Sequence, residues 1–128
     1  MAAWTGERAR GGRSAVPAWA APCRTYGAGP AAPSASAARD AAAWLGEVEP
    51  GGASHIARAV RSAAELAGKH RGDRASWILY IGDGVASIGP RRPAGLAAEV
   101  SRAAGDHIQA STPGIGSDAD STALAALA

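Results

Sequence analysis

Residues 76–84, which read Ser-Trp-Ile-Leu-Tyr-Ile-Gly-Asp-Gly, constrain this 128-residue chain more than any other segment. The five consecutive apolar residues from Trp77 to Ile81 are too few for a helix and are typical of a strand buried on both faces of a parallel sheet. Asp83 follows this strand between two glycines. Open α/β sheets bind ligands at the carboxyl ends of their strands, and flanking glycines let a carboxylate approach a cation closely. We therefore predict a cation or partner site at Asp83.

The remaining periodic segments predict helices and one weaker strand. Apolar residues at helical spacing predict a helix from Ser36 to about Gly46, one from Ser54 to about Ala67, one starting at Pro93, and a last one carrying Leu124 and Leu127. Ser34 or Ser36 can cap the first of these and Ser54 the second. Short strands are expected at about 23–26 and, less strongly, 107–115. The alternation of helices and strands indicates an α/β fold.

Composition narrows the class of protein. The chain has 13 basic and 11 acidic residues, a net charge of +2 that gives no general case for nucleic-acid binding. Residues 1–22 are basic and rich in Ala, Gly and Pro without periodicity, so we expect an irregular leader there. The single cysteine, Cys23, excludes an internal disulfide. No apolar window long enough for a membrane span or a signal peptide occurs, so we expect a soluble, cytoplasmic chain.

Three motifs between Cys23 and Ala128 stand in the order of a known family. They are Glu-Pro-Gly-Gly-Ala-Ser at 49–54, Leu-Tyr-Ile-Gly-Asp-Gly-Val-Ala-Ser-Ile-Gly at 79–89, and Gly-Ile-Gly-Ser-Asp at 114–118. In these motifs the chain resembles a von Willebrand factor type A domain, most closely the bacterial relatives of the inter-alpha-trypsin inhibitor heavy chains. The resemblance implies a domain over residues 23–128 with a doubly wound, Rossmann-like parallel sheet and helices on both faces.

The resemblance also implies a metal-ion-dependent adhesion site. In that family three loops hold Mg²⁺ or a similar divalent cation, and an acidic residue of a protein partner completes the coordination. Ser54 stands where the second loop offers a threonine hydroxyl, and Asp83 where the third loop offers its aspartate. The first-loop motif, Asp-x-Ser-x-Ser, occurs nowhere before Ser54, and His55 stands where Asp or Asn is common. We therefore expect a degenerate metal site of Ser54 and Asp83 that holds Mg²⁺ poorly.

The missing motif belongs to the family's first, central strand, which lies beside the strand at 76–81. We expect that strand to be absent or replaced, which would leave one edge of the 76–81 strand exposed and prone to self-association. The gap predicts that the chain is a fragment or mis-started version of a longer protein, with residues 1–22 in place of the true first half.

Simpler interpretations of these residues remain open. Gly-Asp-Gly after a strand can be a tight turn in which Asp83 caps the next segment. Ser54 can be a helix N-cap alone. Gly114-x-Gly116-x-x-Ala119 fits the dinucleotide-binding pattern, which would make the chain a fragment of an oxidoreductase. That pattern needs an acidic residue about 20 positions later, and the sequence reaches only Ala128.

Catalytic patterns are weaker still. The three histidines, His55, His70 and His107, do not have the spacing of zinc ligands. No nucleophile elbow occurs, because Ile56 stands where a Gly-x-Ser-x-Gly motif around Ser54 would need its second glycine. The sequence therefore predicts a protein-binding module without catalytic residues, not an enzyme.

Overall fold

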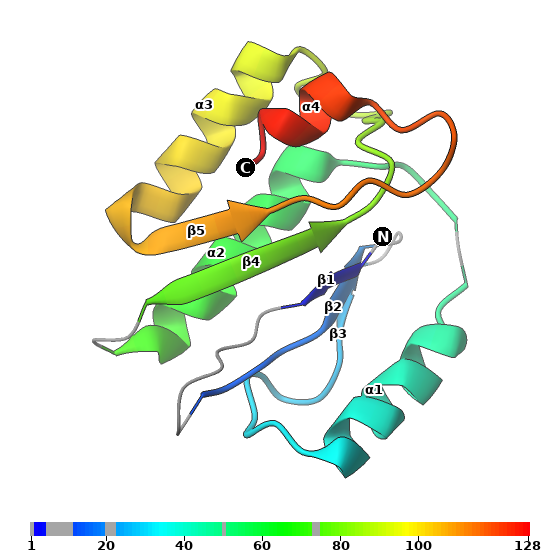
Figure 1. Ribbon diagram of the computed structural model, residues 1–128, viewed down its shortest axis with the longest axis vertical. Helices are drawn as coiled ribbons and strands as arrows, with labels where there is room; N and C mark the ends of the chain where they lie inside the picture. Colours follow the sequence, from blue (N-terminus) through cyan, green and yellow to red (C-terminus); the bar gives the residue numbers. More distant parts are fainter. Residues whose placement is uncertain (1, 5–11, 20–22, 50, 73–74) are drawn as a thin grey trace.

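The computed structural model describes residues 2–4, 12–19, 23–49, 51–72 and 75–128. Its strands are β1 (Ala2–Trp4), β2 (Pro17–Trp19), β3 (Cys23–Thr25), β4 (Ser76–Ile81) and β5 (Ile108–Ser111). Its helices are α1 (Ala35–Gly46), α2 (Ile56–Arg71), α3 (Pro93–Ala104) and α4 (Ser121–Ala125), with a 3-10 turn at Gly105–His107. The strands form one sheet in the order β3-β2-β1-β4-β5 (Figure 1).

The sheet is mixed. β4 and β5 run parallel, with Ser76 opposite Ile108 and Leu79 opposite Ser111. β1 pairs antiparallel with both β4 and β2, and β2 pairs antiparallel with β3. The α/β class expected from the alternating pattern is therefore confirmed, with a parallel part of two described strands.

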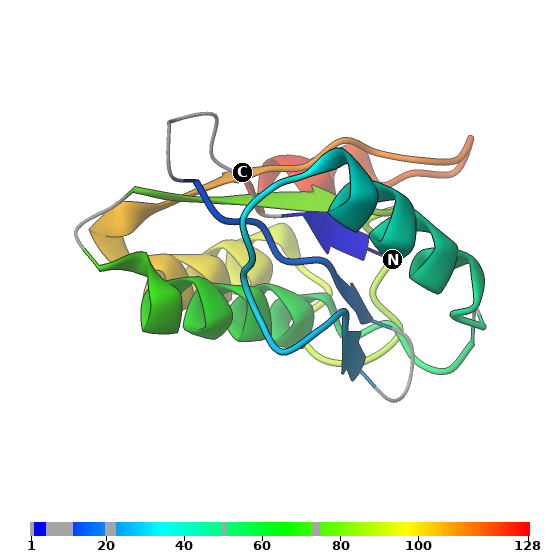
Figure 2. The ribbon, with the colours of Figure 1, turned by 90° about the horizontal axis from the view of Figure 1, so that it is seen from below.

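One face of β4 is buried and the other is partly open. Ile78 and Tyr80 are each 1% exposed and pack against the helices, whereas Trp77 is 50% exposed. Figure 2 shows α2 and α3 together beneath β4, and Figure 1 shows α1 apart from them, at the end of the molecule beyond β3. The prediction of a strand buried on both faces is wrong, because the helical layer covers only the Ile78 and Tyr80 side fully. On the open side, the Trp77 indole N–H donates to the Ser111 hydroxyl at 3.0 Å.

The predicted bare edge of β4 is occupied. β1 lies there, with Ala2 opposite Ile81, Ala3 opposite Tyr80 and Trp4 opposite Leu79. β4 is therefore a central strand, and the edges of the described sheet are β3 and β5. The expectation of an exposed β4 edge is corrected, since an antiparallel strand from the N-terminal segment fills the neighbouring position.

The N-terminal segment contributes to the sheet and to the core. Within 1–22, the described residues include β1 and β2, while 1, 5–11 and 20–22 lie outside the described residues. Ala15, Val16 and Ala18 are buried. The irregular leader expected over 1–22 is thus corrected for 2–4 and 17–19, and the sheet crosses the expected domain boundary because β2 pairs with β3.

The helices begin and end for identifiable reasons. α1 starts after Ser34, whose hydroxyl accepts the Ala37 amide at 3.0 Å, as the sequence predicted. α2 is capped by His55 instead of the predicted Ser54, and it continues through Gly68 to Arg71, beyond the predicted end. None of the described helices is both long enough and apolar enough to cross a bilayer.

Two hydrophobic clusters hold the layers together. The larger joins α2, β4, α3 and the C-terminal residues, and it contains Ile56, Ala57, Val60, Tyr80, Leu96, Ala123, Leu124 and Leu127. The smaller contains Ala63, Ala64 and Ile78. β5 stops at Ser111 and so avoids Pro113, which has no amide hydrogen to donate to a strand. The larger cluster lies directly beneath the loops that follow β4 and β5.

Candidate functional site

The loops that leave β4 and β5 meet at the carboxyl edge of the parallel pair. A parallel bridge between Gly82 and Gly114 extends the pairing beyond the strands. The Ile115 amide also donates to the Gly82 carbonyl at 3.1 Å. We call residues 82–89 and 112–120, together with Ser54, the loop cluster. Sequence reasoning predicted that Asp83 lies at this edge, and the structure places it there.

Asp83 is fixed by its own turn and by the neighbouring loop. One carboxylate oxygen accepts the Val85 amide at 2.9 Å, and the Asp83 carbonyl accepts the Asp120 amide at 2.7 Å. Asp120 in turn caps α4 by accepting the Ala123 amide at 2.9 Å. Asp83 is half-buried, and the Val85 amide holds its carboxylate in this position. The interpretation as a turn-forming aspartate is confirmed.

Ser54 enters the loop cluster through its backbone. Its amide donates to the Ser87 hydroxyl at 2.7 Å, and its carbonyl accepts the amides of Ser87 at 3.0 Å and Ile88 at 3.2 Å. These bonds are made by the Ser54 backbone, and they fix the start of α2 to the loop that carries Asp83. The two predicted site residues thus lie on loops that are hydrogen-bonded together. Pro50, in the same sequence motif as Ser54, lies outside the described residues.

His55 has a local role that the sequence did not reveal. Its Nδ1 accepts the Arg58 amide at 3.2 Å, so it acts as the N-cap of α2. The ring also lies beneath Gly89, where a Cβ atom would come within 2.5 Å of Cε1. Asp and Asn, which are common at this position in the resembled family, are also preferred N-cap residues. Helix capping therefore accounts for His55.

A phenol lies buried under the loop cluster. Tyr80 is 1% exposed, and its hydroxyl lacks a hydrogen-bonding partner of adequate geometry among the described residues. Burial raises the pKa of the Tyr80 phenol, the Asp83 carboxylate raises it further, and the nearby Gly84 amide offsets part of the rise. Tyr80 stays protonated at neutral pH and can act there as a hydrogen-bond donor. Sequence reasoning missed this group, since Tyr80 reads as one more apolar residue of the strand.

Large apolar side chains are exposed around Asp83. Val85 is 47% exposed, Ile88 is 52% exposed and Ile115 is 60% exposed. All three belong to the loop cluster, and Trp77 is the remaining large hydrophobic side chain that is strongly exposed in the described part of the chain. Clustered apolar side chains at a surface mark interaction sites more often than single ones do. The sequence does contain a signal for these exposed side chains, because all three apolar residues lie inside glycine-rich loops.

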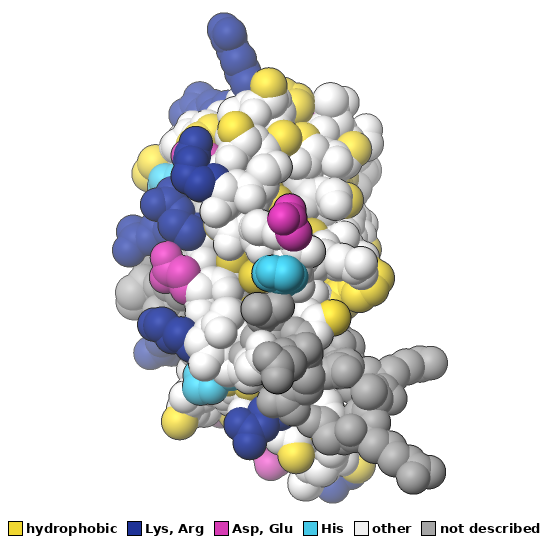
Figure 3. All heavy atoms as spheres, turned by 90° about the vertical axis from the view of Figure 1, so that its left-hand side faces the viewer, with side chains coloured by type: hydrophobic (Ala, Val, Ile, Leu, Met, Phe, Trp, Pro, Cys, Tyr) yellow, Lys and Arg dark blue, Asp and Glu magenta, His cyan; other side chains and the backbone are white. Residues whose placement is uncertain are grey.

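Charge is unevenly distributed over the helices near this edge. Figure 3 shows Lys and Arg side chains gathered along one side of the molecule. Exposed basic side chains include Arg58 and Arg61 in the half of α2 nearer the loop cluster, and Lys69 and Arg102 near the far ends of α2 and α3. Such a surface favours an acidic partner over a basic one.

No family model matches this chain, and neither a curated protein nor a solved structure matches it. The site must therefore be judged from its own residues. Across the described ranges, no group of three or more His, Cys, Asp or Glu side chains is placed to hold a metal ion. Mg²⁺ prefers near-octahedral oxygen ligation, and one oxygen of Asp83 is already engaged by Val85. Ser54 and Asp83 together do not fit a complete Mg²⁺ site, so cation binding at them stays a prediction.

Packing accounts for the glycines of the dinucleotide-like pattern. A Cβ at Gly114 would come within 2.8 Å of Leu124 and 3.4 Å of Ala119. Gly116 has a φ of 102°, which favours glycine, and lies close to the Asp118 carboxylate. Loop geometry and helix packing thus explain glycine at both positions without a nucleotide.

Proposed function

We propose that the chain is a protein-binding module, similar to a von Willebrand factor type A domain, whose loop cluster contacts the partner. The observation that carries this proposal is the exposure of Val85, Ile88 and Ile115 around a fixed carboxylate. Exposed apolar groups beside anchored polar groups are typical of protein interfaces. In this proposal the family's doubly wound sheet is the fold from which the domain derives, and β1 takes the place of that sheet's first central strand.

The hydrogen bonds of the loop cluster support a preformed binding surface. Gly82 and Asp83 are hydrogen-bonded to the 112–120 loop and Ser87 to Ser54, so the apolar side chains are presented on a fixed backbone. Preorganisation lowers the entropy lost on binding. The basic surface of α2 and α3 adds a preference for a partner with acidic residues, as in the resembled family. A nucleic acid is not part of this proposal, and neither is catalysis.

Metal has a minor place in this proposal because the donor set is incomplete. We expect Mg²⁺ or Mn²⁺ to bind weakly, through Asp83 with or without Ser54, and partner binding to persist when divalent cations are chelated. Calorimetric titration with Mn²⁺ of the wild type and of Asp83→Ala checks this directly. If the variant keeps any affinity that the wild type shows, Asp83 is not a ligand.

Affinity capture from the source cells, followed by titration of the purified partner, tests the proposal. Val85→Ser, Ile88→Ser and Ile115→Ser together should weaken binding at least tenfold, since apolar groups at interface centres dominate affinity. Trp77→Ser is the matched control, because it removes an equally exposed apolar side chain outside the loop cluster. Equal binding by the triple variant and the wild type would refute the proposal. A parallel titration with NAD tests the oxidoreductase alternative.

A further inference from the structure

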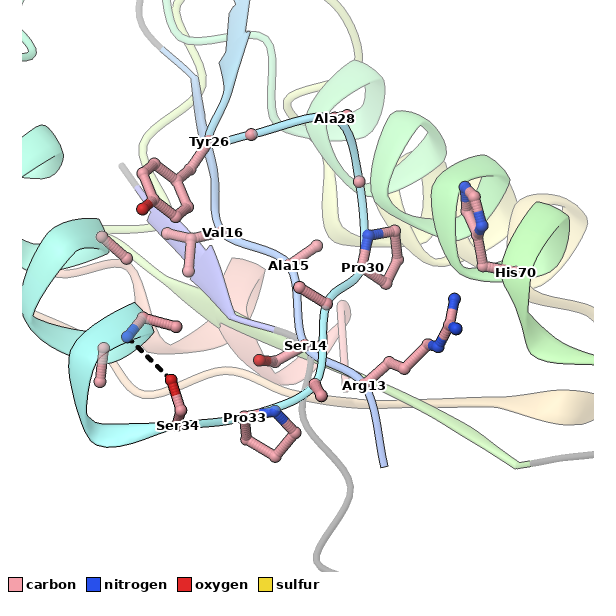
Figure 4. A pocket seen from close by; sticks show the side chains of 17 residues that line it. Arg13, Ser14, Ala15, Val16, Tyr26, Ala28, Pro30, Pro33, Ser34 and His70 are labelled. Atoms are coloured by element: carbon pink, nitrogen blue, oxygen red, sulfur yellow. Dashed lines mark hydrogen bonds between the residues drawn. The ribbon is translucent and has the colours of Figure 1, made fainter. Parts of the chain in front are cut away.

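A pocket of about 390 Å³ lies on a part of the molecule that the proposed function does not use. Its walls are residues 13–16, residues 26–34, the first turns of α1 and His70 near the end of α2 (Figure 4). Small-molecule sites are concave, mostly apolar and about 300–1,000 Å³ in volume. The pocket shares no residue with the loop cluster.

Backbone hydrogen bonds hold the walls of the pocket in place. Ser14 and Ala31 exchange two backbone hydrogen bonds, at 2.8 and 2.9 Å, which join one wall to the other. The Tyr26 amide donates to the Val16 carbonyl at 3.0 Å. The Ser34 hydroxyl caps α1, so it fixes the third wall. Because these bonds are all made within the protein, they hold the walls of the cavity in a defined arrangement.

The lining is apolar along its length and basic at one end. Ala, Pro and Val side chains make up most of it, and none of the described lining residues is acidic. Figure 4 shows Arg13 and His70 at one end of the pocket and Tyr26 at the other. His70 packs against the loop, with its Nε2 3.4 Å from where a Cβ of Gly29 would lie. Arg13 is always charged, and its guanidinium can bind a carboxylate through two hydrogen bonds.

We propose that this pocket binds a small organic anion with an apolar body, of the arylalkanoate class. The carboxylate would lie at Arg13 and His70, and the apolar body would lie between Val16 and Pro30. A cavity of about 150 Å³ already admits benzene, so the volume here suffices for an aromatic ring with a short carboxylate chain. The guanidinium of Arg13 at one end of this apolar lining makes an anion the complementary ligand.

Titration of the ¹⁵N-labelled chain with 3-phenylpropionate, and separately with 3-phenylpropionamide, tests the proposal. The acid should shift the amides of Gly27, Ala28 and Gly29 saturably and should bind more tightly than the isosteric amide. Arg13→Gln should weaken binding of the acid about two- to fivefold, as expected for an exposed ion pair, and His70→Gln should also weaken it because the imidazole hydrogen bond is lost. Neither change should alter the affinity for the amide.

Two matched pairs of variants separate the pocket from the rest of the surface. Ala38→Trp fills the pocket from α1 and should abolish binding, whereas Ala42→Trp adds the same side chain at an exposed α1 position outside the lining. Arg24→Gln removes an exposed arginine elsewhere and should leave the affinity unchanged. Equal affinity for acid and amide, binding that survives Ala38→Trp, or no saturable shift would each overturn the proposal.

Discussion

At Gly84 the chain has no room for a side chain. The residue has a φ of 77°, and a Cβ atom would lie 2.9 Å from both the Asp120 carbonyl oxygen and Leu124 Cγ. The first loop of the cluster therefore passes directly over the start of α4. The close packing at Gly84 therefore helps to fix the position of the neighbouring Asp83.

Gly84→Ala should lower the free energy of unfolding by about 2–4 kcal/mol, since it adds left-handed backbone strain to a steric clash. Gly68→Ala is the matched control, because Gly68 lies exposed inside α2 with nothing within 4 Å of an added Cβ. That change should raise the free energy of unfolding by about 0.5–1 kcal/mol. Urea denaturation measures both, and equal effects at the two positions would contradict the described loop packing.

The Tyr80 hydroxyl lies in the core without a well-placed partner, so removing it should stabilise the protein. Tyr80→Phe is expected to raise the free energy of unfolding at pH 7 by about 1 kcal/mol, the cost of an unsatisfied buried hydroxyl. Tyr26→Phe serves as the comparison, since Tyr26 is only half-buried. A clear loss of stability in Tyr80→Phe would show that the hydroxyl has a partner.

The same phenol predicts a loss of stability at alkaline pH. Its pKa is raised in the folded state, so the unfolded chain ionises first, from about pH 10. The free energy of unfolding is unaffected by ionisation of Tyr80 below that pH, and it decreases as the pH rises above it. Denaturation at pH 8 and pH 11 should show a smaller difference in Tyr80→Phe than in the wild type. An unchanged pH dependence would contradict the raised pKa.

At the scale of elements, α2 connects the loop cluster to the core. Its first turn is capped by His55, its apolar face packs on Tyr80 and Leu96, and Arg61 pairs with Glu99 of α3 at 3.1 Å. A substitution at the start of α2 should therefore also shift Ser54 and the loop that is hydrogen-bonded to it.

His55→Ala should cost about 0.5–2 kcal/mol of stability, because the Arg58 amide loses its acceptor. His55→Asn should recover much of this loss, since Asn is a good N-cap. Thermal unfolding of the two variants checks the comparison. If Asn destabilises the chain as much as Ala does, the ring's packing under Gly89 matters more than the cap.

The ion pairs of Glu99 indicate that the contact between α2 and α3 weakens at acidic pH. The hydrogen bond from Arg102, helped by the charges of Arg102 and Arg61, lowers the pKa of this carboxyl below its usual 4.5. Its contribution is complete above the usual value and is lost as the pH falls through the lowered pKa. Stability should therefore fall less between pH 7 and pH 3 in Glu99→Gln than in the wild type. Glu65→Gln, which removes an exposed carboxylate of α2, is the control.

Helices and strands could be predicted from the sequence where a run of apolar side chains or a capping residue indicates them. The strand at 76–81 was predicted residue for residue, because an apolar run followed by Gly-Asp-Gly leaves few alternatives. The start of α1 was predicted to within a few residues from the two capping candidates Ser34 and Ser36, of which Ser34 is the cap. β1 was not predicted, because its three residues are rich in Ala and show no periodicity. Its pairing with β4 depends on tertiary structure and not on local sequence. The exposure of Trp77 was missed because a run of apolar residues does not show which face a helix covers.

The positions of the two candidate site residues could be predicted in part. Asp83 lies at the expected edge because glycines on both sides and a strand before it fix its place. The position of Ser54 beside Ser87 depends on a contact 33 residues away in sequence, which no local pattern encodes. The pocket beside Arg13 and His70 escaped prediction for the same reason, since its walls come from three separate segments.

At the scale of the whole molecule, β1 joins the antiparallel strands β2 and β3 to the parallel pair β4 and β5. Deleting residues 1–12 would remove this strand and expose a row of unpaired groups along β4. Exposed strand edges pair with other chains. The shortened chain should sediment as oligomers under conditions in which the full chain sediments as a smaller species. Identical sedimentation and identical stability of the two chains would show that β1 is dispensable.

The pairing of Ala2 with Ile81 spans 79 positions of the sequence, the difference between the two residue numbers. During synthesis the β1 segment leaves the ribosome long before β4 exists, so the edge of β1 that faces β4 stays unpaired until residue 81 is translated, although β2 can already pair with the other edge. Long-range strand pairings of this type slow folding, since the entropy of closing the loop is lost before any contact is gained. A nascent chain stalled before β4 should therefore recruit chaperones through its unsatisfied first strand.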